Sequence, residues 1–139
     1  MKRELLERSI ELNKKINQLC TNKDLVQKKC SHIGRMECTL LQLLAEKKQG
    51  VCMNELAAVL SVSHSRVTRI VDTLVEKKLV NRFPSEIDRR KWFAKITESG
   101  IKMAEQSYKY TLKIQENILA RLPEAEKVLD AVEAYLNEF

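Results

Sequence analysis

The sequence predicts a mainly α-helical fold that carries one small β-hairpin. Apolar residues recur at three- and four-residue intervals over most of the chain, which is the spacing of amphipathic helices. Only three glycines and two prolines occur among 139 residues, and this favours long helices. The exception lies between residues 79 and 97, where β-branched and aromatic residues concentrate in two short runs. A chain of this length is expected to form one domain.

Three helices are predicted in the first part of the chain. The first carries an apolar stripe of Leu5, Leu12, Ile16 and Leu19. We expect the polar segment 21–29 to interrupt this helix. The second covers the apolar positions from Ile33 to Leu44, and the third is a short helix from Met53 to Leu60.

A tight turn, Ser61-Val62-Ser63, leads into a fourth helix, for which Ser63 is the expected N-cap. In this helix the core-facing residues are Val67, Ile70, Val71 and Leu74. The residues left on the outside are small, polar or cationic: His64, Ser65, Arg66, Thr68, Arg69, Asp72 and Thr73. The free N–H groups and the dipole at the N-terminal end of such a helix favour phosphate.

The runs Leu79 to Phe83 and Trp92 to Thr97 are predicted to pair as antiparallel strands. Residues 84–91 connect them and are too long for a tight turn, so this connection should project. Its tip is Asp88-Arg89-Arg90-Lys91. We expect Trp92 and Phe93 to pack the hairpin onto the body rather than to stack on bases.

A polar, cationic helix followed by a basic hairpin is typical of a winged helix-turn-helix DNA-binding unit. The net charge of the chain is +6, and residues 61–97 carry nine Lys/Arg against four Asp/Glu, a net charge of +5. We expect Ser65 and Arg66 to contact base edges. Phosphate contacts are expected from Ser63 and Arg69, while His64 could contact either. The complete predicted set of DNA-binding residues is Ser63, His64, Ser65, Arg66, Thr68, Arg69, Arg82, Asp88, Arg89, Arg90 and Lys91.

Two interpretations of the hairpin tip are open at this point. Asp88 and Arg90 can pair across the tip and stiffen it. Alternatively, Arg90 can enter a minor groove, where narrowing concentrates negative potential. Further phosphate contacts, which set affinity without reading sequence, are expected from Arg82, Arg89, Lys91 and Lys95.

Two further helices are predicted after the hairpin. Thr97-Glu98-Ser99-Gly100 opens a fifth helix that runs to roughly Arg121, and Pro123 suits the first turn of a sixth. Their apolar stripes, with that of the first helix, offer more apolar surface than a monomer can cover. We therefore predict a homodimer, with residues 1–32 and 100–139 as dimerisation helices around a winged helix-turn-helix unit of residues 33–99.

Residues 53–100 resemble the MarR family, the multiple-antibiotic-resistance type of winged-helix transcription regulator. The matching segments are Glu55-Leu56-Ala57, Ser63 to Arg69, Asp88-Arg89-Arg90 and Thr97-Glu98-Ser99-Gly100. The resemblance implies a homodimer that represses transcription from a pseudo-palindromic site in double-stranded DNA. It also implies control by a small-molecule effector or by thiol oxidation. The alternative is a winged-helix module that binds protein and not DNA.

The chain departs from the family pattern at two positions. Lys78 occupies a position where the family commonly has Gly between the recognition helix and the wing. Cys52 replaces the usual Ser or Thr N-cap, and Glu55 follows three residues later as if to complete a capping box.

The four cysteines include no C-x-x-C pair. Cys52 is predicted at a helix N-terminus, and Cys20 and Cys30 lie near several lysines; both settings lower the pKa of a thiol. These three residues are therefore candidate redox sensors, although a structural role is favoured for each. Cys38 is expected to be a small buried hydrophobe.

Other functional classes find little support in the sequence. No zinc site is expected, because the neighbours Cys30 and His32 lack further ligands and His64 belongs to the DNA-binding face. No catalytic or cofactor-binding motif is present, so we expect neither an enzyme nor a cofactor. No apolar run approaches the ~18 residues of a membrane span, and the start of the chain is not a signal peptide. The expected location is the cytoplasm.

Overall fold

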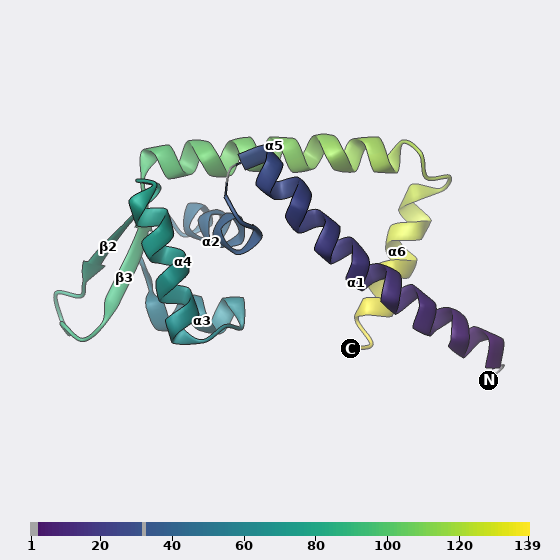
Figure 1. The fold of residues 1–139 in the computed structure, drawn as a ribbon, viewed down its shortest axis with the longest axis horizontal. Helices are drawn as coiled ribbons and strands as arrows, with labels where there is room; N and C mark the ends of the chain where they lie inside the picture. Colours follow the sequence, from purple (N-terminus) through teal and green to yellow (C-terminus); the bar gives the residue numbers. More distant parts are fainter. Residues whose placement is uncertain (1–2, 32) are drawn as a thin grey trace. The chain divides into compact units, whose positions relative to one another are not determined.

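The computed structural model describes residues 3–31 and 33–139, apart from the side chains of residues 17 and 19–31. In chain order the elements are α1 (Arg3–Ser31), α2 (Arg35–Glu46), β1 (Val51–Cys52), α3 (Met53–Leu60), α4 (His64–Glu76), β2 (Val80–Pro84), β3 (Trp92–Ile96), α5 (Glu98–Leu119) and α6 (Ala125–Leu136) (Figure 1). The chain divides into a first unit that ends at Ser107 and a second unit, residues 108–139. A mainly α-helical fold with a small β-wing is confirmed.

The core of the first unit lies between α2, α3, α4 and the small sheet. Its fully buried side chains include Leu40, Leu41, Leu44, Leu56, Val67, Val71, Leu74 and Val80. In α4 the spacing of Val67, Val71 and Leu74 places all three on one face of the helix, and each is inaccessible to solvent. Burial of side chains of this size contributes about 1.5–3 kcal/mol each. This apolar face fixes α4 on the body and leaves its other face free.

The sheet has three antiparallel strands in the order β1-β3-β2. The two longer strands form the predicted hairpin, with Val80 opposite Ile96 and Phe83 opposite Phe93. Each begins or ends one residue from its expected limit. The third strand, β1, was not predicted, because two residues are too few to show an alternating pattern.

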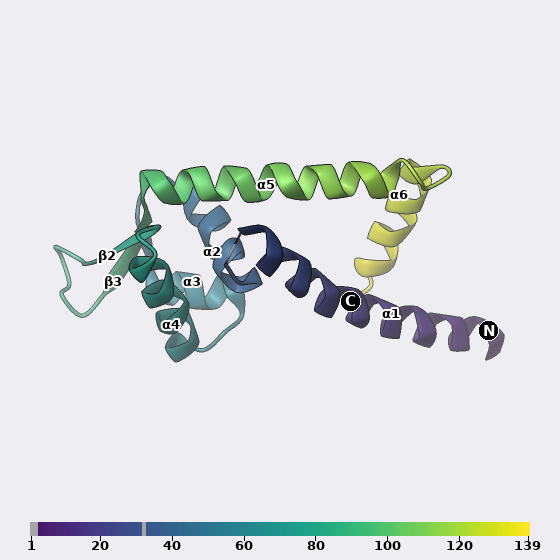
Figure 2. The same ribbon diagram turned by 45° about the horizontal axis from the view of Figure 1, so that its top comes forward.

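The segment Thr97 to Gly100 joins the end of the hairpin to the end of α4. The Thr97 hydroxyl donates to the carbonyl of Lys78 at 2.8 Å, and the same oxygen accepts from the Gly100 N–H at 3.0 Å. A Cβ on Gly100 would lie 2.1 Å from the carbonyl oxygen of Leu79, so only glycine allows this approach. The segment therefore fixes the start of α5 against the α4–β2 junction (Figure 2).

The predicted interruption of the first helix is wrong, because α1 is continuous from Arg3 to Ser31. Residues 21–29 are polar but contain neither glycine nor proline. Lys, Gln and Asp tolerate helical geometry at a cost of only about 0.7 kcal/mol or less each, so polarity alone does not end a helix.

Two expectations about helix N-termini are also wrong. Cys52 is the N-cap of α3 but makes no side-chain capping bond, and Glu55 instead pairs with Lys47 at 2.6 Å. The reciprocal bond of a capping box occurs at α2, where the Gly34 N–H donates to Glu37 at 3.1 Å. Pro123 precedes the sixth helix by two residues instead of lying in its first turn.

The second unit contains the end of α5 and the whole of α6. Residues 108–139 are all described, and none of them is buried. Large apolar side chains on α6 are exposed instead: Val128, Leu129, Val132 and Leu136. Leu5 and Leu12 on α1 are likewise exposed. In the described part of the chain, no helix has the length and apolar character needed to cross a membrane.

Candidate nucleic-acid interface

The turn between α3 and α4 sets the start of the polar helix. Ser61 adopts a left-handed conformation with φ of 52°, and the Val62 N–H donates to the Ala57 carbonyl at 3.1 Å. This arrangement ends α3 abruptly. The Ser63 hydroxyl then accepts from the Arg66 N–H at 3.2 Å, which confirms Ser63 as the N-cap of α4. Ser63 thus has a structural role in addition to any contact with a ligand.

The N-terminal half of α4 presents a polar face to solvent. His64, Ser65, Arg66 and Arg69 are all exposed. Thr68 is half-buried, and its hydroxyl donates to the His64 carbonyl at 3.0 Å. No acidic residue lies in the first turn of the helix. Positive charge and short side chains therefore coincide at the positive end of the helix dipole.

The loop at the end of the hairpin is held by its own hydrogen bonds. The Ser85 hydroxyl accepts from the N–H groups of Ile87 and Asp88 at 3.2 and 3.3 Å. The Ser85 N–H donates to the Lys91 carbonyl at 2.8 Å, and the Lys91 N–H donates to the Asp88 carbonyl at 2.9 Å. These four bonds give the tip a defined shape without help from the body of the protein.

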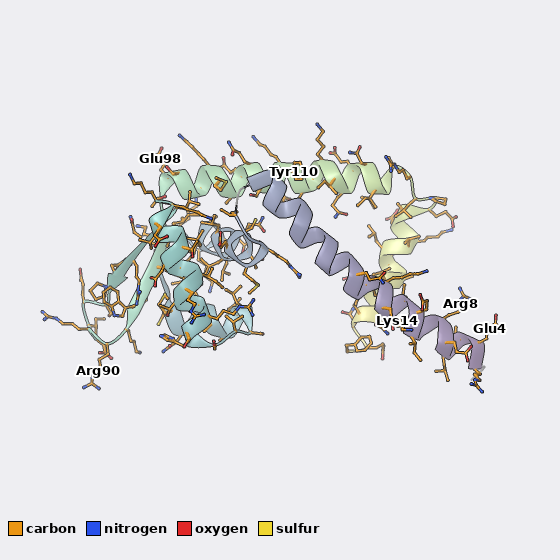
Figure 3. The ribbon with its side chains drawn as sticks, in the orientation of Figure 1. Glu4, Arg8, Lys14, Arg90, Glu98 and Tyr110 are labelled. Atoms are coloured by element: carbon orange, nitrogen blue, oxygen red, sulfur yellow. The ribbon has the colours of Figure 1, made fainter. Side chains whose placement is uncertain are left out.

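The role of Asp88 follows from this loop geometry. Its carboxylate accepts from the backbone N–H of Arg90 at 3.1 Å, so it stiffens the tip through the main chain. The side chain of Arg90 extends outward from the wing (Figure 3). The two interpretations of the tip are therefore compatible: Asp88 orders the turn, and the Arg90 guanidinium extends away from it.

Arg82 does not extend freely from the hairpin as a phosphate contact would. Its Nη1 lies 3.0 Å from Oδ1 of Asp72 on α4, and its Cζ lies 4.8 Å from the centre of the Trp92 ring. Trp92 is thus covered by an arginine, while Phe93 stacks on Phe83 with ring centres 5.9 Å apart. Both rings therefore contact the neighbouring strand of the hairpin, and Trp92 remains 39% exposed, so the expected packing of Trp92 onto the body is not observed.

The cluster of Arg82, Asp72 and Trp92 was not predicted from the sequence. Arg82 and Pro84 share one face of β2, and Trp92 is opposite Pro84, so Arg82 and Trp92 form a diagonal cross-strand pair. That relation could have been found from the hairpin register. The contact with Asp72 could not, because it depends on how α4 packs beside the sheet.

The structure describes the side chains of two of the four cysteines. Cys38 is buried in the core, as predicted, and Cys52 is a half-buried free thiol. The side chains of Cys20 and Cys30, and the whole of His32, lie outside the described residues. Among the side chains that the structure describes, no group of three His, Cys, Asp or Glu is arranged to hold a metal ion.

Part of the chain matches a known protein family. Residues 35–92 match the model of the MarR family. A relative described as an uncharacterized HTH-type transcriptional regulator, YpoP of Bacillus subtilis, is 38% identical over 73 residues, which cover 52% of this chain and 51% of YpoP. The chain spans about half the length of the curated relatives it matches.

Solved structures match over nearly the whole chain. A mutant of MarR from E. coli in complex with operator DNA has a TM-score of 0.78 and 25% identity, with 96% of each chain covered. The transcriptional regulator BldR from Sulfolobus solfataricus has a TM-score of 0.77 and 20% identity over the full length of both chains. The winged helix-turn-helix arrangement with flanking helices is therefore an established fold.

Proposed function

We propose that this chain, which belongs to the MarR family, is a sequence-specific DNA-binding transcription regulator that acts as a homodimer. One observation carries the proposal: the exposed face at the start of α4 is small, polar and cationic, and a basic hairpin projects beside it (Figure 1). The DNA-bound MarR structure, which has the same fold, supports it. The proposed action is repression at a pseudo-palindromic operator.

The proposed docking follows from the shape of the two elements. The N-terminal half of α4 enters a major groove, where Ser65 and Arg66 meet base edges and Arg69 meets a phosphate. The tip of the wing reaches an adjacent minor groove, into which Arg90 extends. Arg89 and Lys91 add sequence-independent contacts to the backbone.

In the proposed homodimer, a second copy of the chain binds the second half-site of the operator with its own α4. The exposed apolar residues of α6, with those of α1, give the proposed contact surface. Two associated copies would supply two α4 helices, one for each of two successive major grooves. Release of DNA by a small ligand or by oxidation of a thiol would act through the spacing of the two helices.

A winged-helix module that binds protein is less well supported. Exposed arginines at a helix N-terminus and at a hairpin tip match the charge of a phosphate backbone. An interface for protein would instead favour aromatic and aliphatic residues at its centre. Ile87 is 99% exposed, but it lies alone among charged neighbours.

The proposal is tested by selecting duplexes from a random library with the purified protein and then measuring affinity by fluorescence anisotropy. Arg66→Ala should weaken binding to the selected duplex by about 1–3 kcal/mol and relax preference at one base pair. Arg90→Ala should weaken binding to all duplexes and reduce the salt dependence by about one phosphate contact.

Lys102→Ala is the matched control for these variants. It removes one exposed positive charge from α5, whose start lies beside the C-terminal end of α4 and away from Ser63. Its affinity should stay close to that of the wild type. If no duplex is enriched at low salt, or if all three variants lose affinity equally, DNA binding through α4 and the wing is refuted.

A further inference from the structure

We propose that Arg82 is a positioning residue, which couples the angle of the wing to α4 through Asp72 and Trp92. This inference rests on the proposed DNA-binding function and goes further by assigning a role to each member of the cluster. It replaces the expected phosphate contact of Arg82 with an internal one. We call these three residues the wing brace.

The wing brace joins three different elements. Asp72 lies on α4, Arg82 on β2 and Trp92 at the start of β3. The guanidinium of Arg82 is held from two directions, by the carboxylate at 3.0 Å and by the ring at 4.8 Å. Its Nε is buried and has no hydrogen-bond partner among the described residues. One nitrogen of the planar guanidinium contacts the carboxylate while its central carbon lies over the ring, and the compact ammonium group of a lysine lacks this planar geometry.

The accessibility of the brace argues for orientation and against a large effect on stability. The side chains of Arg82 and Asp72 are 29% and 52% exposed, and pairs in such positions contribute little to folding. The pair nevertheless connects α4 to the hairpin whose loop carries Arg90. A shift in hairpin angle would move that loop relative to the major-groove contacts, and displacement of about 1 Å already weakens directional contacts.

The negative charge of Asp72 allows a test of the proposal, because charge repulsion and the wing brace predict opposite changes in DNA affinity when Asp72 is removed. Asp72 is an exposed carboxylate on the helix proposed to enter the groove. By charge alone, its removal should tighten binding, because it repels phosphates and neutralises Arg82. The brace predicts the opposite: loss of Asp72 frees the wing and weakens specific binding.

The DNA experiment compares Asp72→Ala, Arg82→Gln and the double variant with Glu76→Ala. Glu76 is another exposed acid on α4, one turn further on, and serves as the charge-matched control. We expect each brace variant to weaken binding to the selected duplex about tenfold and to lower the ratio of specific to non-specific affinity. The double variant should be no weaker than either single variant, because both break one contact. Glu76→Ala should bind as tightly as the wild type or more tightly.

A second measurement needs no DNA. Trp92 is the only tryptophan of the chain, so its fluorescence reports on the brace directly. Arg82 covers the ring, and Asp72→Ala should therefore increase the quenching of Trp92 by acrylamide, while Glu76→Ala should not. An unchanged quenching constant for Asp72→Ala would overturn the brace, whatever the DNA result.

The two measurements separate the failure of this inference from that of the proposed function. If the wild type enriches no duplex but quenching responds to Asp72→Ala, the brace stands and DNA binding fails. If the wild type binds DNA, Asp72→Ala binds more tightly and Arg82→Gln loses about one unit of salt dependence, Arg82 is a phosphate contact and the brace is wrong.

Discussion

The winged helix-turn-helix part of the first unit and the second unit, residues 108–139, differ in what they bury. The former surrounds fully buried side chains such as Leu56 and Leu74, whereas the latter buries no side chain at all. Both are helical and both have amphipathic patterns. The difference shows that an apolar stripe predicts a contact surface without saying whether the partner belongs to the same chain.

The same contrast separates two kinds of functional surface. In the first unit, the core holds α4 so that a polar face remains outside, and this face is proposed to bind DNA. In the second unit, the apolar face itself remains outside, and it is proposed to bind a second copy. Exposed apolar residues aligned on one helix face mark an interaction site far more strongly than scattered ones.

The largest expected effect is on the free energy of unfolding, and it is tested by making a leucine-to-alanine substitution in each unit. Leu74→Ala removes a fully buried side chain and should lower the free energy of unfolding by about 2–5 kcal/mol. Leu129→Ala removes a side chain that is 51% exposed and should lower it by less than about 1 kcal/mol in dilute protein. Urea denaturation followed by circular dichroism measures both. Equal losses at low protein concentration would contradict the comparison.

A charge on α6 should affect association more than folding. Leu129→Glu would place a carboxylate in the proposed contact between two copies, where an unpaired charge is strongly unfavourable. We expect its self-association to weaken about 100-fold, equivalent to about 2.7 kcal/mol. Sedimentation equilibrium measures this loss. Asp130→Asn is the control, since Asp130 is the exposed polar neighbour on the same helix and its change should leave association intact.

Helix α4 could be predicted from the sequence more completely than the contacts that surround it. Val67, Val71 and Leu74 define the buried face by spacing alone, and Ser63 defines the helix start by chemistry that acts within one turn. Both signals are local. The pairing of Asp72 with Arg82 depends on the packing of a helix beside a sheet, and no local pattern encodes that distance.

Wrong predictions arose where local signals compete with tertiary structure. Glu55 follows Cys52 by three residues, which is the sequence spacing of a capping box. In the folded chain, however, the Glu55 carboxylate forms an ion pair with Lys47. The polar segment 21–29 was mistaken for a break, although nothing in it prevents helical geometry. The short strand β1 pairs with the edge of β3 that β2 does not occupy, and a run of two residues is too short to predict this pairing from the sequence.

The smallest expected effect is at Lys78, the residue between α4 and β2. Its φ is 61°, and it forms the left-handed position of a Schellman motif: the Lys78 N–H donates to Val75 at 2.9 Å and the Leu79 N–H donates to Leu74 at 2.9 Å. Any residue with a Cβ costs about 1–2 kcal/mol there, while glycine loses about 0.5–1 kcal/mol more entropy on folding. Lys78→Gly should therefore raise the free energy of unfolding by about 0.5–1 kcal/mol.

The control for this prediction is Lys78→Ala, which removes the same charge and side chain but keeps the Cβ. It should leave the free energy of unfolding unchanged or slightly lower, because the left-handed strain remains. Urea midpoints for the two variants separate backbone strain from charge. If Lys78→Ala stabilises the protein as much as Lys78→Gly, the gain comes from loss of repulsion within the basic region of residues 61–97, and the left-handed conformation of Lys78 costs nothing measurable.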